Sequence, residues 1–240
     1  CSSDLEEQFQ PPDSAGETDL STVADMTTKQ PVTMYFDVTC PFAWVTSRWL
    51  KEVEKVREIE LNFAPMSLFI LNDGREGLSE GYERAMTAAR GPALVAAALH
   101  TESPELVDPY YTVLGTKIHS EGNSHKQDPH GYDELIKETL AEIGAKAELF
   151  DVAHKDADAE GSVMKQLQDS HDHAISLVGD DVGTPVVQLG ERAFFGPVLT
   201  RIPEGETAGA LFDASVTLGG YPHFFELKRS RTEDPKPEFA

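Results

Sequence analysis

The sequence has few cysteines and no long apolar run. Only two cysteines, Cys1 and Cys40, occur in 240 residues. A chain of this length with so few cysteines is not a disulfide-stapled secreted scaffold, and it fits a reducing compartment. No uninterrupted apolar segment approaches the roughly 20 residues that a membrane-spanning helix needs. The sequence therefore predicts no membrane span and a cytoplasmic location.

Basic side chains are also scarce. The chain has 20 Lys and Arg against 42 Asp and Glu, which gives a formal net charge of −22. A field of this sign repels phosphate backbones, so we expect no nucleic-acid partner. The hydrophobic content of 40% is that of a globular protein, and the length suffices for one large domain or two small ones.

The first 30 residues differ in composition from the rest. They contain seven acidic side chains and a single basic one, Lys29. Such a segment buries little apolar surface, so residues 1–30 are predicted to be a disordered acidic tail. We expect Met26 to be the natural start, with residues 1–25 an incidental extension. The alternative is a lipoprotein anchored through Cys1, since a mature bacterial lipoprotein begins with a cysteine and a polar tether.

The patterning after the tail predicts an α/β fold. An apolar, β-branched run at 32–37 indicates a buried strand, 41–57 has helical periodicity, and 59–63 alternates as a half-buried strand does. Strand, helix and strand within 35 residues form a βαβ unit. Strand signals return at 185–189 and 193–195 as a hairpin, before a last helix near 206–218.

The region between these parts has helical signals alone. Ala, Leu, Glu and Lys recur at helical spacing, interrupted by predicted breaks such as Gly91-Pro92. The predicted helical segments lie near 79–100, 106–121, 131–143, 146–154 and 157–178. We therefore expect a core in two parts, a helical insertion of about a hundred residues, and a polar C-terminal tail. The predicted limits are 31–71 and 181–227 for the core, 72–180 for the insertion and 228–240 for the tail.

Cys40 is the main candidate for chemistry. It stands between the first strand and the first helix, and Pro41 suits the first helical position, where its missing N–H costs nothing. Cys40 is then the N-cap residue, and its sulfur faces unpaired backbone donors and the positive end of the helix dipole. This placement favours the thiolate and predicts a lowered cysteine pKa. The alternative is an inert cysteine that packs as a small apolar residue.

A second feature supports a reactive Cys40. Thr184-Pro185 lies directly before the third predicted strand. A cis X–Pro bond can open a strand and present the preceding backbone to a bound thiol or an extended peptide. Together with Cys-Pro at a helix start, the pair indicates a thiol site shaped by Thr184 and Pro185.

In this order of elements and motifs, the chain resembles the DsbA-type thioredoxin-like superfamily. Within it, the chain is similar to the actinobacterial mycothiol-dependent reductases, also called nitroreductases. The resemblance implies a thioredoxin-like fold with a large all-helical insertion, and it covers nearly everything from 32 to 233. Matching stretches include Thr39-Cys40-Pro41, Trp44-Val45-Thr46-Ser47-Arg48-Trp49, Met66-Ser67-Leu68, Asp180-Asp181-Val182-Gly183-Thr184-Pro185, Phe194-Phe195-Gly196-Pro197 and Tyr221-Pro222-His223-Phe224-Phe225.

The chain departs from the family at one position that matters for mechanism. The family motif is Cys-Pro-Trp-Cys, whereas this chain has Cys40-Pro41-Phe42-Ala43 and so lacks the resolving cysteine. The resemblance then implies a monothiol oxidoreductase that uses a low-molecular-weight thiol such as mycothiol as co-substrate, with no tightly bound cofactor. Its substrates would be small disulfides or electrophiles. The alternatives are a kappa-class glutathione-transferase-like or isomerase activity, and a non-catalytic binding protein.

Four further residues are secondary candidates for the site, together with Pro41 and Phe42 as thiol-binding or substrate-binding residues. Asp37 could raise the pKa of Cys40 or relay a proton, although a carboxylate there more often caps a turn. The family places substrate-contacting residues at Asn72 and Tyr82, which as local features are a turn former and a helix-face aromatic. His119 is expected to line a cleft between insertion and core.

No metal site is predicted from the histidines or acidic residues. His171 and His173 are two apart and would project to different sides of a helix, whereas metal ligands on a helix are three or four apart. The basic cluster from Lys228 to Arg231 stands out in an acidic chain. It could attract an anionic thiol, but a solvated tail is the default. The oligomeric state is left open.

Overall fold

The computed structural model describes residues 29–155 and 162–239. The predicted acidic tail therefore lies almost entirely outside the described residues, as do Met26 and Cys1. Among the described residues, no helix is both long and apolar enough to cross a membrane.

Four strands form one sheet in the order β2-β1-β3-β4. The strands β1 (Gln30–Phe36) and β2 (Ile59–Pro65) are parallel, as expected of a βαβ unit, and pair Val32 with Leu61. The hairpin strands β3 (Val186–Leu189) and β4 (Arg192–Phe195) are antiparallel, and β3 pairs antiparallel with β1. Because β1 is central, its side chains are buried on both faces, which explains its apolar run.

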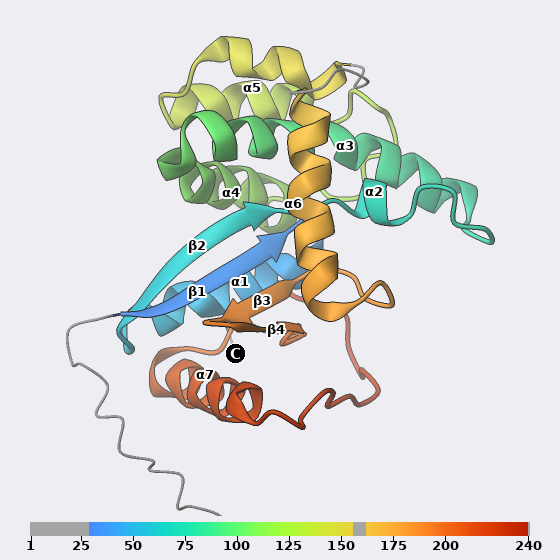
Figure 1. Ribbon diagram of the computed structural model, residues 1–240. Coiled ribbons are helices and arrows are strands. Elements are labelled where there is room, and N and C mark those ends of the chain that lie inside the picture. The colour runs from blue at the N-terminus through green and yellow to red at the C-terminus, as the bar shows by residue number, and fades with distance from the viewer. Residues whose placement is uncertain (1–28, 156–161, 240) are drawn as a thin grey trace, which may run out of the picture.

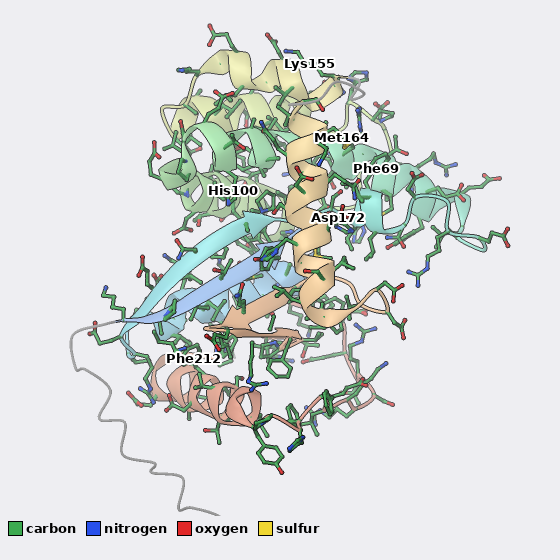
Figure 2. The ribbon with its side chains drawn as sticks, in the orientation of Figure 1. Phe69, His100, Lys155, Met164, Asp172 and Phe212 are labelled. Atoms are coloured by element: carbon green, nitrogen blue, oxygen red, sulfur yellow. The ribbon has the colours of Figure 1, made fainter. Side chains whose placement is uncertain are left out.

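Helices cover both faces of this sheet (Figure 1). On one face lie α1 (Pro41–Val53) and α7 (Gly205–Gly220), joined by a hydrogen bond from the Trp49 indole N–H to the Ala208 carbonyl at 3.0 Å. Phe212 of α7 is buried between that helix and the sheet (Figure 2). On the opposite face, α6 (Val163–Val178) packs Ala174 against Tyr35 and Val186.

In the described part of the predicted insertion, the helices between residues 80 and 154 stand at one end of the sheet, whereas α6 runs from there along one face of the sheet (Figure 1). The longest helix of the insertion, α3 (Glu80–Glu102), continues through Gly91 and Pro92, so the predicted break there is wrong. Proline removes one backbone donor from a helix, and the buried run from Ala88 to Leu99 keeps the helix in place. The other elements are α2 (Leu68–Leu71), η1 (Pro104–Leu106), α4 (Val107–Gly115), η2 (Thr116–Ser120), α5 (Asp133–Glu142) and η3 (Ala147–His154).

The C-terminal segment is exposed in most of its side chains, but its backbone is paired with the 200–202 segment. The N–H of Lys236 donates to the Thr200 carbonyl at 2.8 Å, and Arg201 forms an ion pair with Glu233 at 3.0 Å. The predicted polar tail is therefore held against the core rather than being a freely solvated end.

Candidate active site around Cys40

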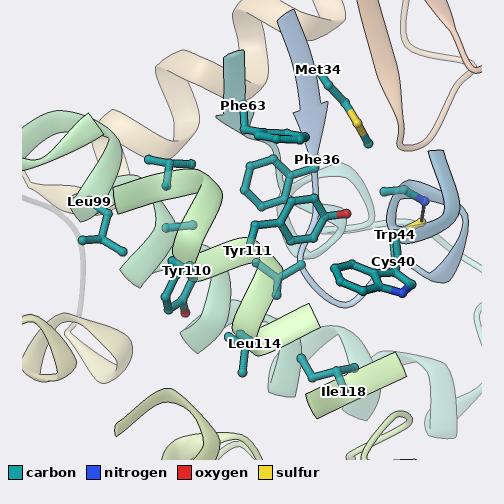
Figure 3. Close-up of a cluster of buried hydrophobic side chains, with 14 of the residues drawn as sticks. Met34, Phe36, Cys40, Trp44, Phe63, Leu99, Tyr110, Tyr111, Leu114 and Ile118 are labelled. Carbon is teal, nitrogen blue, oxygen red and sulfur yellow. Dashed lines mark hydrogen bonds between the residues drawn. The ribbon is translucent and has the colours of Figure 1, made fainter. Parts of the chain in front are cut away.

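Cys40 is the N-cap residue of α1, as the sequence predicted. Its backbone is extended (φ −77°, ψ 116°), and Pro41 occupies the first turn. The Ala43 N–H donates to Sγ at 3.5 Å, and the thiol donates to the Thr184 carbonyl at 3.4 Å. The side chain is only 5% exposed and lies beside Trp44 and Tyr111 (Figure 3). Cys40 is the one free cysteine among the described residues.

Thr184 and Pro185 come from a distant part of the sequence and lie next to Cys40. Their peptide bond is cis, and Pro185 directly precedes β3. The Thr184 carbonyl accepts the hydrogen bond from Cys40, whereas its buried Oγ1 has no hydrogen-bond partner among the described residues. The structure therefore brings together two segments that are 144 residues apart in the sequence.

The direction of the Cys40 pKa differs from the sequence prediction. Burial raises the pKa of the Cys40 thiol above its ordinary value, and the nearby Asp37 raises it further. The neighbouring Thr184 side chain, followed by the Ala43 and Phe42 N–H groups, lowers the pKa but does not offset the effect of burial. The prediction of a lowered pKa was wrong because it considered the helix N-terminus alone and not the side chains that exclude water. Burial therefore favours the thiol over the thiolate at Cys40.

Asp37 is buried and braces the loop that carries Cys40. Its Oδ1 accepts hydrogen bonds from the Thr39 N–H at 2.8 Å and the Thr39 hydroxyl at 2.7 Å, and its Oδ2 accepts from the Leu68 N–H at 2.8 Å. Burial raises the pKa of the Asp37 carboxyl as well. The carboxylate thus caps both the loop and the start of α2, and it raises the Cys40 pKa through its charge.

His119 lies behind the Cys40 loop on the insertion side. Its Nε2 is 2.9 Å from the Val38 carbonyl, and its ring stacks on Trp44 with centroids 5.6 Å apart. Burial lowers the pKa of His119 to about 4, so the ring is neutral near pH 7. Gly115 makes this contact possible, because a Cβ there would lie 2.3 Å from the Trp44 ring.

Asn72 and Tyr82 contact each other at the end of α2. The Asn72 amide donates to the Leu68 carbonyl at 2.8 Å and to the Tyr82 hydroxyl at 3.4 Å. Burial raises the Tyr82 pKa, and the neighbouring Cys40 and Asp37 raise it further. The Tyr82 residue remains 39% exposed.

Two residues at the site were not among its predicted members, although Arg231 belongs to the basic cluster that stood out in the sequence. Tyr111 of α4 stacks on Phe36 with ring centroids 3.9 Å apart, and it is fully buried with an unpaired hydroxyl among the described residues. Arg231 of the C-terminal segment lies 4.6 Å from the ring centroid of Phe42, a cation–π distance. One residue of the basic cluster, Arg231, therefore contacts the motif that contains Cys40.

The other groups weighed from the sequence lie apart from one another. The buried His171 ring is 3.5 Å from the Ser67 N–H, whereas the His173 ring packs against Tyr35, so the two histidines face different neighbours. A cavity of about 470 Å³ lies at the opposite end of α1 from Cys40. Its lining includes charged side chains, of which Lys51 pairs with Asp108 at 2.9 Å.

Comparisons of the sequence with known proteins identify a family and a relative. The family described as "Mycothiol-dependent nitroreductase Rv2466c" matches residues 39–229. "Uncharacterized protein Rv2286c" of Mycobacterium tuberculosis is 28% identical over 201 residues, which are 84% of this chain and 82% of that protein.

Two solved structures resemble the fold at low sequence identity. A 2-hydroxychromene-2-carboxylate isomerase has a TM-score of 0.52 at 14% identity, covering 79% of this chain and 95% of that one. A putative protein disulfide isomerase from Nitrosomonas europaea has a TM-score of 0.50 at 10% identity, covering 79% and 98%. The predicted thioredoxin-like fold with a helical insertion is confirmed. The match over residues 39–229 places the chain in the mycothiol-dependent nitroreductase Rv2466c family, whose function is thiol-dependent redox chemistry.

Proposed function

We propose that the protein is a monothiol oxidoreductase in which Cys40 forms a mixed disulfide with a low-molecular-weight thiol, mycothiol in its natural setting. One observation carries the proposal. The Cys40 sulfur lies at the N-terminus of α1 against the Thr184 carbonyl, while Ala43 occupies the position of the missing second thiol. A disulfide between two cysteines of this motif cannot form, so a second thiol molecule has to resolve the intermediate. We place this reaction in the cytoplasm.

The proposed cycle balances with small thiols alone. The Cys40 thiolate attacks one sulfur of a disulfide RS–SR′, a Cys40–SR bond forms, and R′S⁻ leaves and takes up a proton. A second thiolate RS⁻ then attacks the outer sulfur and releases RSSR and the Cys40 thiolate. For a small electrophile bonded to the Cys40 sulfur, RS⁻ attacks the Cys40 sulfur, a Cys40–SR bond forms, and the electrophile leaves with the bonding electrons and takes up a proton. A second RS⁻ then releases RSSR and the Cys40 thiolate, so two RSH molecules supply the two electrons.

The raised pKa of Cys40 makes loss of its proton part of the proposed cycle. Asp37 is the proposed proton relay, because its own pKa is raised and its charge acts on Cys40. A bound thiol would lie against the cis Thr184-Pro185 bond and the first turn of α1, with Pro41 and Phe42 as its other contacts. Asn72, Tyr82 and His119 are proposed to line the remaining sides of the substrate site.

A second candidate function follows from the same protonated thiol. A buried Cys40 S–H could donate a hydrogen bond to a bound thiolate and steady it, as in kappa-class glutathione-transferase-like or isomerase chemistry. In this alternative Cys40 never forms a covalent bond. A non-catalytic binding protein is the third alternative, and it requires neither step.

Intact-mass measurement after incubation with mycothiol disulfide or glutathione disulfide separates these functions. We expect one thiol adduct per chain in a Cys1→Ser protein, which excess thiol removes. The Cys1→Ser/Cys40→Ser protein, its matched control, should gain no adduct. Thiol binding without an adduct in the Cys1→Ser protein would contradict exchange and favour the second function. Neither adduct nor binding would favour the third.

A further inference from the structure

Outside the Cys40 site, three side chains of the helical insertion converge on one point. They are His130 in the loop before α5, Asp133 at the start of α5 and His154 at the end of η3. Asp133 Oδ2 is 2.9 Å from His130 Nδ1, and Asp133 Oδ1 is 2.8 Å from His154 Nε2. One carboxylate thus holds two imidazole rings whose centroids are 4.2 Å apart.

Among the described residues, the Asp133 carboxylate pairs with the two histidines and with no other basic side chain. The Asp133 side chain is 17% exposed, and no lysine or arginine among the described residues forms an ion pair with it. Lys137, one turn along α5, pairs with Glu134 instead, at 2.7 Å. Asp133 is thus a half-buried carboxylate whose neighbours in the cluster are two imidazole rings.

We propose that His130, Asp133 and His154 bind a single divalent transition-metal ion of the zinc class. Two imidazole nitrogens and one carboxylate oxygen are the donor set that zinc accepts in sites with an open fourth position. The candidate ligand atoms all lie within 4.8 Å of one another. Neighbouring ligands of a tetrahedral zinc lie roughly 3.4 Å apart, so a turn of the Asp133 carboxylate and small ring movements suffice.

Each ring nitrogen that faces Asp133 lies at hydrogen-bonding distance from a carboxylate oxygen. A proton on that nitrogen would leave it when the metal binds, either to the far ring nitrogen (Nε2 of His130, Nδ1 of His154) or to solvent, and the freed lone pair ligates the ion. His130 remains 67% exposed in its side chain, which leaves room for water as the fourth ligand.

The backbone around the cluster supports a built site. The His130 N–H donates to the Asp128 carboxylate at 2.8 Å, which holds the loop in place before α5 begins. A metal here would join the end of η3 to the start of α5, far from the sheet, as the position of the adjacent Lys155 indicates (Figure 2). We assign it a structural role within the insertion, independent of the thiol chemistry at Cys40.

Titration of the metal-free protein with Co²⁺, followed by visible absorption and then by displacement with Zn²⁺, tests the proposal. The Cys1→Ser/Cys40→Ser protein is used, so that no thiolate contributes to binding. We expect one Co²⁺ per chain with the absorption of a four-coordinate ion, and we expect Zn²⁺ to displace it. Zinc should also raise the melting temperature, and a chelator should reverse that rise.

Variants of single ligands give the decisive comparison. His154→Gln and Asp133→Asn should each weaken Co²⁺ binding by at least about tenfold, because two ligands remain. The matched control His223→Gln changes an exposed histidine elsewhere and should bind as the parent does. Circular dichroism verifies that each variant is folded. Absence of a one-to-one complex in the parent, or equal binding by a folded His154→Gln protein, would overturn the proposal and leave a metal-free hydrogen-bonded clamp.

Discussion

Two sides of Cys40 are built from different kinds of contact. On the loop side, Asp37 and Thr184 make short polar contacts with the backbone and the thiol. On the insertion side, Tyr111 and His119 cover Trp44 with aromatic rings, and the Trp44 indole N–H has no hydrogen-bond partner in the described part of the chain. The loop side positions the sulfur, whereas the insertion side excludes water. The exclusion of water decides the protonation of the thiol.

The largest effect should come from the protonation of His119 on the insertion side. Its pKa is lowered from 6.5 to about 4 by burial, so the folded state binds this proton less readily than the unfolded state. The neutral His119 therefore contributes its full share to the free energy of unfolding above pH 6.5. This contribution is lost as the pH falls through 4, and the total loss is about 3 kcal/mol. Denaturant unfolding of wild type and His119→Gln at several pH values measures this loss.

The variant should lose less stability over the same pH range, because glutamine does not titrate. His223→Gln, which changes an exposed histidine, is the matched control and should follow the wild type. Parallel pH profiles for wild type and His119→Gln would show that the insertion side does not bury this imidazole as the structure describes it.

The next effect concerns the fit between Gly115 and Trp44. In Gly115→Ala, the new Cβ would lie 2.3 Å from the Trp44 ring, so the indole or α4 has to move. We expect a loss of about 2 kcal/mol in the free energy of unfolding, typical of an overpacked core. The control Gly220→Ala adds a methyl group at the end of α7, where nothing lies within 4 Å, and should cost little. An unchanged Gly115→Ala protein would contradict close packing on the insertion side.

The same contrast explains which features could be predicted from the sequence. The N-cap position of Cys40 depends on its neighbours Pro41 and Ala43, so local patterning suffices to predict it. The Thr184-Pro185 pair was predicted at the site because a cis X–Pro bond can open a strand and present the preceding backbone to a thiol, and Cys-Pro begins the first helix. Burial of the thiol could not be predicted, because Tyr111 and His119 are more than 70 residues away in the sequence.

Long-range contacts also explain what else the sequence did not predict. The helix α3 continues through Pro92 because helices far along the chain bury its middle, and a propensity argument has no access to that packing. The prediction of no metal site from the sequence used the spacing of His171 and His173, which lie on the same helix. His130, Asp133 and His154 come together only because η3 packs against α5, so a spacing rule within one element does not find them.

The smallest effect tests the loop side and decides between two roles for Asp37. In Asp37→Asn the negative charge that raises the Cys40 pKa is removed. If the carboxylate acts only through its charge, alkylation of Cys40 at neutral pH should become roughly two- to fivefold faster. If Asp37 instead accepts the thiol proton during exchange, mixed-disulfide formation should become slower. The pH dependence of both rates in wild type and variant gives the measurement.

Asp37→Asn also disturbs hydrogen bonds, since one amide group cannot accept from both Thr39 and the Leu68 N–H. Thr39→Val is therefore the matched control, because it removes one hydrogen bond to Asp37 and keeps the charge. A change shared by both variants reports the loop conformation, and only a change confined to Asp37→Asn reports the carboxylate charge. Faster alkylation with slower exchange would assign Asp37 both a field effect and a proton-relay role, and an unchanged pair of rates would assign it neither.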